Sequence, residues 1–219
     1  MDFFLSNIDV YVQAIGQTLF MVFVSMVVAG FLGLALGIAL YVTRPGNLLS
    51  HRAVFTVLNV VVNIIRPIPF VIFITAISPL TSAVVGTTIG SNAAAFALSL
   101  AAAFAVSRIV EQSLVSIDPG VIEAARAVGA APVRIIFTVL IPEGLGPLIL
   151  GYSFIFVGIV DMSAQAGLIG GGGLGDFAVS YGSQRYNWTV VYVTVATIVV
   201  IVQLGQFVGN HLARKALRR

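Results

Sequence analysis

Long uninterrupted apolar segments dominate the chain. The first covers about residues 13–42, contains no Asp, Glu, Lys, Arg or His, and ends at the turn sequence TRPG. A helix needs about 20 apolar residues to cross about 30 Å of hydrocarbon. Four further segments reach or approach that length, at about 53–80, 92–112, 145–164 and 188–210. The pattern predicts five transmembrane helices in one membrane domain that covers residues 1–219.

Helices rather than strands fit these segments. Strands that span a membrane alternate apolar and polar positions over about ten residues, whereas the runs here are continuous. The second segment alone contains a marked interruption, where the chain reads RPIP from Arg66 to Pro69. The expected fold class is therefore an all-α integral membrane protein.

The composition agrees with lipid as the surrounding solvent. The chain is 59% hydrophobic and 9% charged, with a mean hydropathy of +1.08. Soluble domains have about 25% charged residues, and a chain of this length cannot bury so much apolar surface by itself. A nucleic-acid role would need a basic domain that faces water, and no segment has that character.

The placement of basic residues predicts an orientation. Cytoplasmic loops of membrane proteins carry an excess of Lys and Arg. In or beside the segments that connect or follow the predicted spans, one side has most of them, and the other side has only Arg185. We therefore expect the N-terminus outside and the C-terminus in the cytoplasm. The basic residues on the predicted cytoplasmic side are Arg44, Arg52, Arg108, Arg126, Arg134, Arg214, Lys215, Arg218 and Arg219.

The connection at 118–142 is long for a loop in a compact membrane protein and reads as two short helices. Asp118 suits the N-cap of the first helix, Pro119 its first position and Gly129 its C-terminal cap. A second helix is expected to open at Pro132 and to stop at Pro142. The predicted fold thus has five spans and a cytoplasmic two-helix loop.

The same loop contains a spaced motif. From Glu123 to Pro142 the chain reads EAARAVGAAPVRIIFTVLIP. This resembles the EAA loop of ABC importer permeases, with the pattern EAA-x3-G-x9-I-x-L-P, in which Val139 and Ile141 replace the Ile and Leu. The resemblance implies that the loop couples the membrane subunit to an ATPase, through Glu123, Ala124, Ala125, Arg126, Gly129 and Pro142.

A wider resemblance to methionine-importer permeases covers about residues 11–212. It rests on TRPG at 43–46, RPIPF at 66–70, GTTIG at 86–90 and GGGGLG at 170–175. It implies the type I ABC importer permease fold, in the bacterial inner membrane, in a homodimer of this subunit. The implied partners are two cytosolic ATPase subunits, which would bind ATP and magnesium, an extracytoplasmic substrate-binding lipoprotein and an amino-acid substrate. Chemical catalysis and cofactors are then not expected on this chain.

One stretch departs from that family pattern. Where small neutral residues are expected, the chain has an acid in the fourth span, followed by Met162 and Ser163. An acid inside a membrane faces a polar interior or path by default, so Asp161 is expected to contact a substrate ammonium or Arg66, or else to reach the outer interface. Arg66 lies either at an internal cavity or at the interface. The candidate path residues are Arg66, Asp161, Met162 and Ser163.

Two other classes of protein match parts of this sequence less well. Asp161 would also suit an ion-coupled secondary transporter, but no inverted repeat is detectable and the long cytoplasmic loop would have no purpose. The sequence GLGD ending at Asp176 matches intramembrane aspartyl proteases, yet Asp161 lies too close along the chain for two facing spans.

Neither nucleotide nor metal binding is expected on the chain. Gly170, Gly172 and Gly175 satisfy G-x-G-x-x-G but lack the strand before and helix after that phosphate binding needs. They read instead as an external loop, flexible or tightly packed. His51 and His211 are too far apart in sequence to suggest a metal site. The substrate itself stays open between L-methionine, D-methionine, a derivative and a short peptide.

Overall fold

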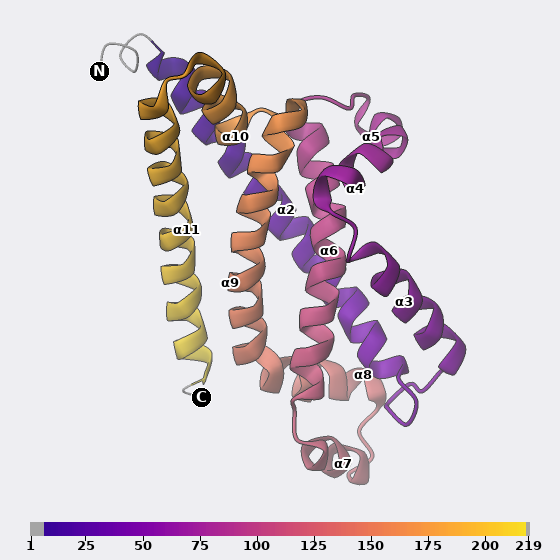
Figure 1. Cartoon of the computed structure of the whole chain (residues 1–219). Coiled ribbons are helices and arrows are strands. Elements are labelled where there is room, and N and C mark those ends of the chain that lie inside the picture. The colour runs from indigo at the N-terminus through magenta and orange to yellow at the C-terminus, as the bar shows by residue number, and fades with distance from the viewer. Residues whose placement is uncertain (1–6, 218–219) are drawn as a thin grey trace.

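The computed structural model describes residues 7–217, and every regular element in that range is helical. Four long helical segments are apolar enough to cross a membrane. Three of them are α2 (Ile8–Thr43), α6 (Ser91–Val115) and α11 (Trp188–Leu217), and the fourth contains α9 (Ile141–Ala166). Figure 1 shows them side by side, with the start of α2 and the end of α11 at opposite ends of the bundle.

The fifth candidate span is broken. It consists of α3 (Arg52–Ile65) and α4 (Phe70–Ala76), which are bent by 111° relative to each other, and is followed by α5 (Ser78–Val85). Pro67 and Pro69 have no backbone N–H to continue the helical ladder, so the chain turns there. The segment predicted at 53–80 is thus a bent crossing rather than one straight helix, and α3 ends about halfway along α6 (Figure 1).

Glycines bring α2 and α6 close together. Gly33 and Gly37 lie one turn apart on α2 and face Val106 and Val110 of α6, and a Cβ on either glycine would come within about 2.5 Å of the facing valine. Small residues at this spacing let helix backbones approach, which replaces the hydrophobic driving force that lipid does not supply. The G-x-x-x-G spacing here therefore serves packing within one chain.

Glycines also bring α9 and α11 close together. Gly205 and Gly209 of α11 lie against the side chains of Phe156 and Ser153 of α9. In turn, the Tyr152 hydroxyl of α9 donates to the Gly30 carbonyl of α2 at 2.7 Å. Three of the long helices are thus joined by close backbone approaches and a cross-helix hydrogen bond.

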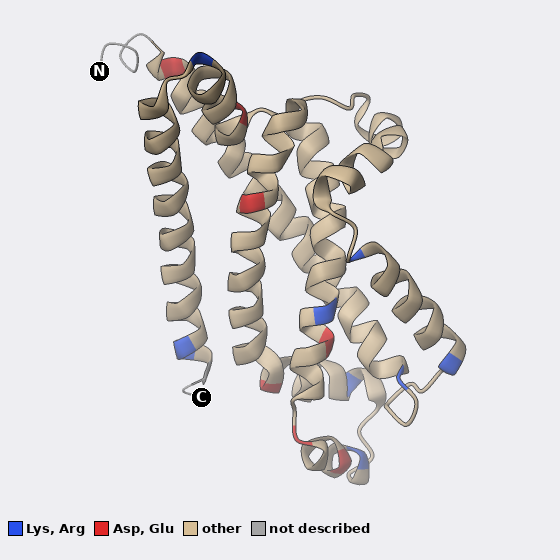
Figure 2. Cartoon of the chain, viewed as in Figure 1, with Lys and Arg blue, Asp and Glu red and all other residues tan. Residues whose placement is uncertain are grey.

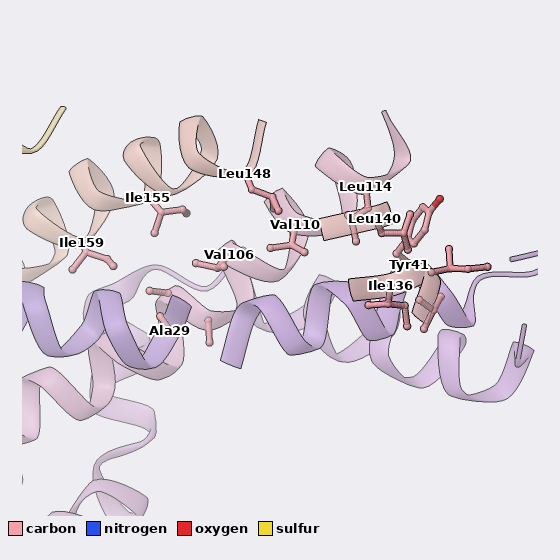
Figure 3. Packing of buried hydrophobic residues seen from close by; sticks show 14 of the residues in the cluster. Ala29, Tyr41, Val106, Val110, Leu114, Ile136, Leu140, Leu148, Ile155 and Ile159 are labelled. Atoms are coloured by element: carbon pink, nitrogen blue, oxygen red, sulfur yellow. The ribbon is translucent and has the colours of Figure 1, made fainter. Parts of the chain in front are cut away.

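The core lies where α2, α6 and α9 meet, and it continues toward the loop that precedes α9 (Figure 3). Ala29, Val110, Leu114 and Ile159 are buried there. The outer faces are different: Phe31 and Phe154, for example, are 73% and 74% exposed. Large apolar side chains on the outside fit a hydrocarbon solvent.

The glycine run at 170–175 is tightly packed. It belongs to a kinked segment, Gly167–Gly171, and to α10 (Gly173–Phe177), where most of the glycines are buried. Gln17 and Thr18 of α2 accept hydrogen bonds from the Gly173 and Leu174 N–H groups, both at 2.8 Å. Of the two predicted alternatives, the packed one is therefore present.

Candidate functional site

The loop between α6 and α9 forms a small separate helix, α7 (Pro119–Ala127), that projects beyond the end of the bundle (Figure 1). The Asp118 carboxylate caps it by accepting a hydrogen bond from the Gly120 N–H at 2.8 Å. Pro119 occupies the first turn, where no N–H is needed. The local sequence therefore starts the helix where the pattern predicts.

The end of α7 has a Schellman-type cap. The Gly129 N–H donates to the Arg126 carbonyl at 2.9 Å, and the Ala130 N–H donates to the Ala125 carbonyl at 3.2 Å. Gly129 has a φ of +77°, a conformation that side chains with a Cβ rarely adopt. Both ends of α7 are thus specified by residues within it or next to it.

One face of α7 packs against the core and the other face is exposed. Ile122 is buried against the main core and Ala125 is half-buried beside it, while Glu123, Ala124 and Arg126 are exposed. Within residues 7–217 neither the Glu123 carboxylate nor the Arg126 guanidinium has an ion-pair partner. The arrangement presents two charges and a small-residue surface to another molecule.

The segment after α7 leads into α9 without a break. α8 (Pro132–Ile135) passes into a π-helical turn, Ile136–Leu140, and this into α9. The prediction that the second helix stops at Pro142 is wrong, because Pro142 lies in the first turn of α9 and the wider turn before it accommodates the missing N–H. Ile135 and Leu140 are 1% and 0% exposed, so this connection is anchored in the core.

Among residues 7–217, no ion pair or hydrogen bond joins Arg66 to the other three candidate path residues. Asp161 is exposed on α9, and its carboxylate accepts from the Gln165 amide at 2.9 Å. Ser163 is buried and its hydroxyl donates to the Val160 carbonyl at 2.7 Å, while Met162 packs between core clusters. Arg66 is exposed at the end of α3 and has no ion pair with Asp161.

The acids that suggested a protease have separate partners. Asp176 accepts a hydrogen bond from the Ser180 hydroxyl at 2.8 Å, and Asp161 accepts from Gln165. No hydrogen bond joins these two carboxylates among the described residues. In the same range, no cluster of three or more His, Cys, Asp or Glu side chains is placed to hold a metal ion.

A polar network between α3 and α6 escaped the sequence reasoning. Arg108 forms an ion pair with Glu111, and its other terminal nitrogen donates to the amide oxygens of Asn59 at 2.5 Å and Asn63 at 2.6 Å. These residues line a pocket of about 440 Å³ together with Arg44, Arg66, Gln112 and Val115. The sequence does contain a signal for this network. Asn59 and Asn63 lie on one face of a helix, and so do Arg108 and Glu111, because residues three or four positions apart are neighbours on a helix surface.

Comparison with known proteins shows that the chain is similar to permease subunits of transport systems. Residues 31–218 match the family described as binding-protein-dependent transport system inner membrane component. The probable D-methionine transport system permease protein MetI of Vibrio cholerae is 40% identical over 218 residues, which are 100% of this chain and 97% of that protein. The methionine import system permease protein MetP of Bacillus subtilis is 42% identical over 171 residues, 78% of this chain and 77% of MetP.

A solved structure is similar over nearly the whole chain. It is an inward-facing conformation of the MetNI methionine ABC transporter, with a TM-score of 0.94 and 38% sequence identity. The match covers 96% of this chain and 98% of the chain in that structure. A second structure, an amino-acid ABC transporter with histidines, has a TM-score of 0.79 at 19% identity and shows the shared fold alone.

Proposed function

The chain belongs to the family of binding-protein-dependent transport system inner membrane components and is the permease of an ATP-driven importer, and we propose that methionine or a close relative is its substrate. It is an inner-membrane transport subunit and not an enzyme. The similarity to MetI, MetP and MetNI proteins supports the choice of substrate.

The working assembly would contain two copies of this chain, two cytosolic ATPase subunits that bind ATP and magnesium, and an extracytoplasmic substrate-binding lipoprotein. Basic residues gather at the end of the bundle that carries α7 (Figure 2). That distribution supports a cytoplasmic position for this end and for the end of α11. The start of α2 would then lie outside.

The observation that carries the coupling proposal is the projecting helix α7. Its free face, with Glu123, Ala124 and Arg126, would dock on the ATPase, and its caps would keep it helical while force acts on it. The helical segment from Pro132 to Ala166 is continuous through α8, the π-helical turn and α9. Movement of the ATPase would therefore pass through Pro142 into α9 and open the dimer alternately to the two sides.

Asp161 and Arg66 are our candidates for the translocation path. The exposed Asp161 carboxylate is costly in lipid, so it would face a water-filled path, where it would attract the ammonium of an amino acid. Met162 and Ser163 follow Asp161 on α9. Because Ser163 is buried here, it would line the path only after α9 rotates.

Reconstitution tests the proposal. The permease, its ATPase and its binding protein are placed in liposomes, and uptake of labelled methionine is measured with and without ATP. We expect uptake to require ATP and to continue after the ion gradients are collapsed. Uptake driven by an ion gradient without ATP would instead support the secondary-transporter alternative, and Asp161→Asn would then abolish transport.

A further inference from the structure

We propose that the pocket between α2, α3 and α6 binds one anionic oxygen group, a carboxylate or a phosphate, through the guanidinium groups of Arg44 and Arg66. The pocket has a volume of about 440 Å³, and its lining is rich in polar side chains. A groove of about 760 Å³ between α2, α9 and α11 is by contrast almost wholly apolar and suits hydrocarbon.

The charges in this pocket do not balance. Of its three arginines, Arg108 is satisfied by Glu111, Asn59 and Asn63. Arg44 and Arg66 are exposed and have no acceptor for their side chains among residues 7–217. Two positive charges therefore remain uncompensated, while the one carboxylate of the lining is already paired.

The position of Arg66 favours an anion beside it. Arg66 directly follows α3, whose upper end lies about halfway along α6 (Figure 1). An unpaired charge at such a depth is expensive, and arginines inside membranes are found paired or at aqueous cavities. Guanidinium groups bind carboxylates and phosphates through paired hydrogen bonds, so these are the groups that fit.

Two sources can supply the anion: the phosphate of an acidic phospholipid, or the carboxylate of the transported amino acid. The second source rests on the proposed function. In either case the recognised group is the anion alone, because Glu111 is occupied by Arg108 and leaves no carboxylate free for an ammonium. The pocket thus recognises one end of its ligand.

The test uses the complex purified from its membrane, with Arg44→Gln, Arg66→Gln and the double variant. Arg52→Gln is the matched control, since Arg52 is an exposed arginine of α3 outside the pocket lining. Native mass spectrometry measures retention of phosphatidylglycerol against phosphatidylcholine. Uptake of labelled methionine in phosphatidylcholine vesicles gives the KM.

A lipid site predicts that the double variant retains phosphatidylglycerol about tenfold less tightly, and that Arg44→Gln, which lies outside the candidate path, weakens retention with an unchanged KM. A substrate site predicts a KM raised about tenfold with unchanged lipid retention. Either result supports the pocket as an anion site if the control is unaffected. The proposal is overturned if neither quantity changes, or if the control loses as much as the double variant.

The two arms also separate this inference from the proposed function. If the wild-type complex does not import methionine, the proposed substrate is wrong, but lipid retention still reports on the pocket. The single variants replace exposed side chains without protein partners and so preserve the fold. If the double variant does not assemble, lipid retention and KM are compared between the single variants and the control instead.

Discussion

At the scale of residues, single positions fix particular features of the structure. Gly129 ends α7 in a left-handed conformation, and Arg108 joins α3 to α6. The end of α7 at Gly129 depends on local sequence and was predicted from the position of Gly129 in the loop. The contact of Arg108 with α3 depends on partners 49 and 45 positions away, which the order of residues does not reveal.

Replacing Gly129 tests the cap of α7. Gly129→Ala forces a Cβ into a backbone conformation with φ of +77°, which costs about 1 kcal/mol. We expect a frayed α7 and weaker substrate-stimulated ATPase activity of the complex, with the permease still inserted. The comparison is Gly120→Ala, near the other end of α7, where φ is not positive.

Coupling by the free face of α7 has its own test. Glu123→Lys reverses the unpaired charge that we expect to meet the ATPase. Substrate-stimulated ATPase activity should fall severalfold while the amount of permease in the membrane is unchanged. Full stimulation in both Glu123→Lys and Gly129→Ala would remove α7 from the mechanism.

The Arg108 network is tested by stability. Arg108→Ala leaves Glu111, which is 5% exposed, buried without its ion-pair partner. Breaking a buried pair in this way costs about 3–5 kcal/mol. We expect a lower midpoint of thermal unfolding in detergent, and the double variant Arg108→Ala/Glu111→Gln should recover part of it. A midpoint equal to that of Arg52→Ala would show that the network contributes little.

At the scale of elements, glycines let the long helices approach closely, and large apolar side chains such as Leu114 and Ile159 fill the core between them. Each apolar helix has no reason to leave lipid for another apolar surface, so close backbone contact supplies the attraction. This explains why α2 and α6 meet at Gly33 and Gly37. It also explains why the outer faces keep large exposed residues such as Phe23.

Adding one methyl group at the α2–α6 contact should therefore be costly. A Cβ at Gly37 would come within 2.6 Å of the Ser107 carbonyl oxygen and 2.5 Å of the Val110 Cβ. Gly37→Ala should destabilise the fold by about 1–3 kcal/mol through overpacking, read as a lower midpoint of thermal unfolding. Gly16→Ala on the same helix meets no atom within 4 Å and should leave the midpoint unchanged or raise it.

At the scale of the whole molecule, five candidate spans account for the position of the two ends of the described chain at opposite ends of the bundle (Figure 1). The bent pair of α3 and α4 is needed for that count. The end with α7 carries most of the basic residues, as Figure 2 shows. The orientation follows from that charge distribution and stays a prediction.

Cysteine labelling tests the orientation, since the chain has no cysteine of its own. Val128→Cys and Tyr186→Cys replace side chains that are 84% and 83% exposed, at opposite ends of the molecule. In intact cells, a thiol reagent that does not cross the membrane should label Cys at 186 and not at 128. The reverse pattern would place α7 outside and refute the coupling role.

The sequence by itself determined the features that depend on neighbouring residues and on the solvent. Span length, absence of charge and basic flanks predict membrane helices, because the hydrocarbon imposes these conditions on each segment separately. The first helix of loop 118–142 was predictable because Asp118, Pro119 and Gly129 act on their own backbone, whereas the second helix continues past the predicted stop at Pro142. The EAA spacing then indicated the family, which the comparisons confirm.

Only the tertiary structure decided which helix faces meet. The 111° bend that turns α4 away from α3, the burial of Ser163 beside an exposed Asp161, and the Arg108 network all depend on contacts between distant segments. In a uniformly apolar chain the hydrophobic pattern does not mark an inner face, because lipid and protein interior are equally apolar. Packing at glycines and a few polar contacts make that choice.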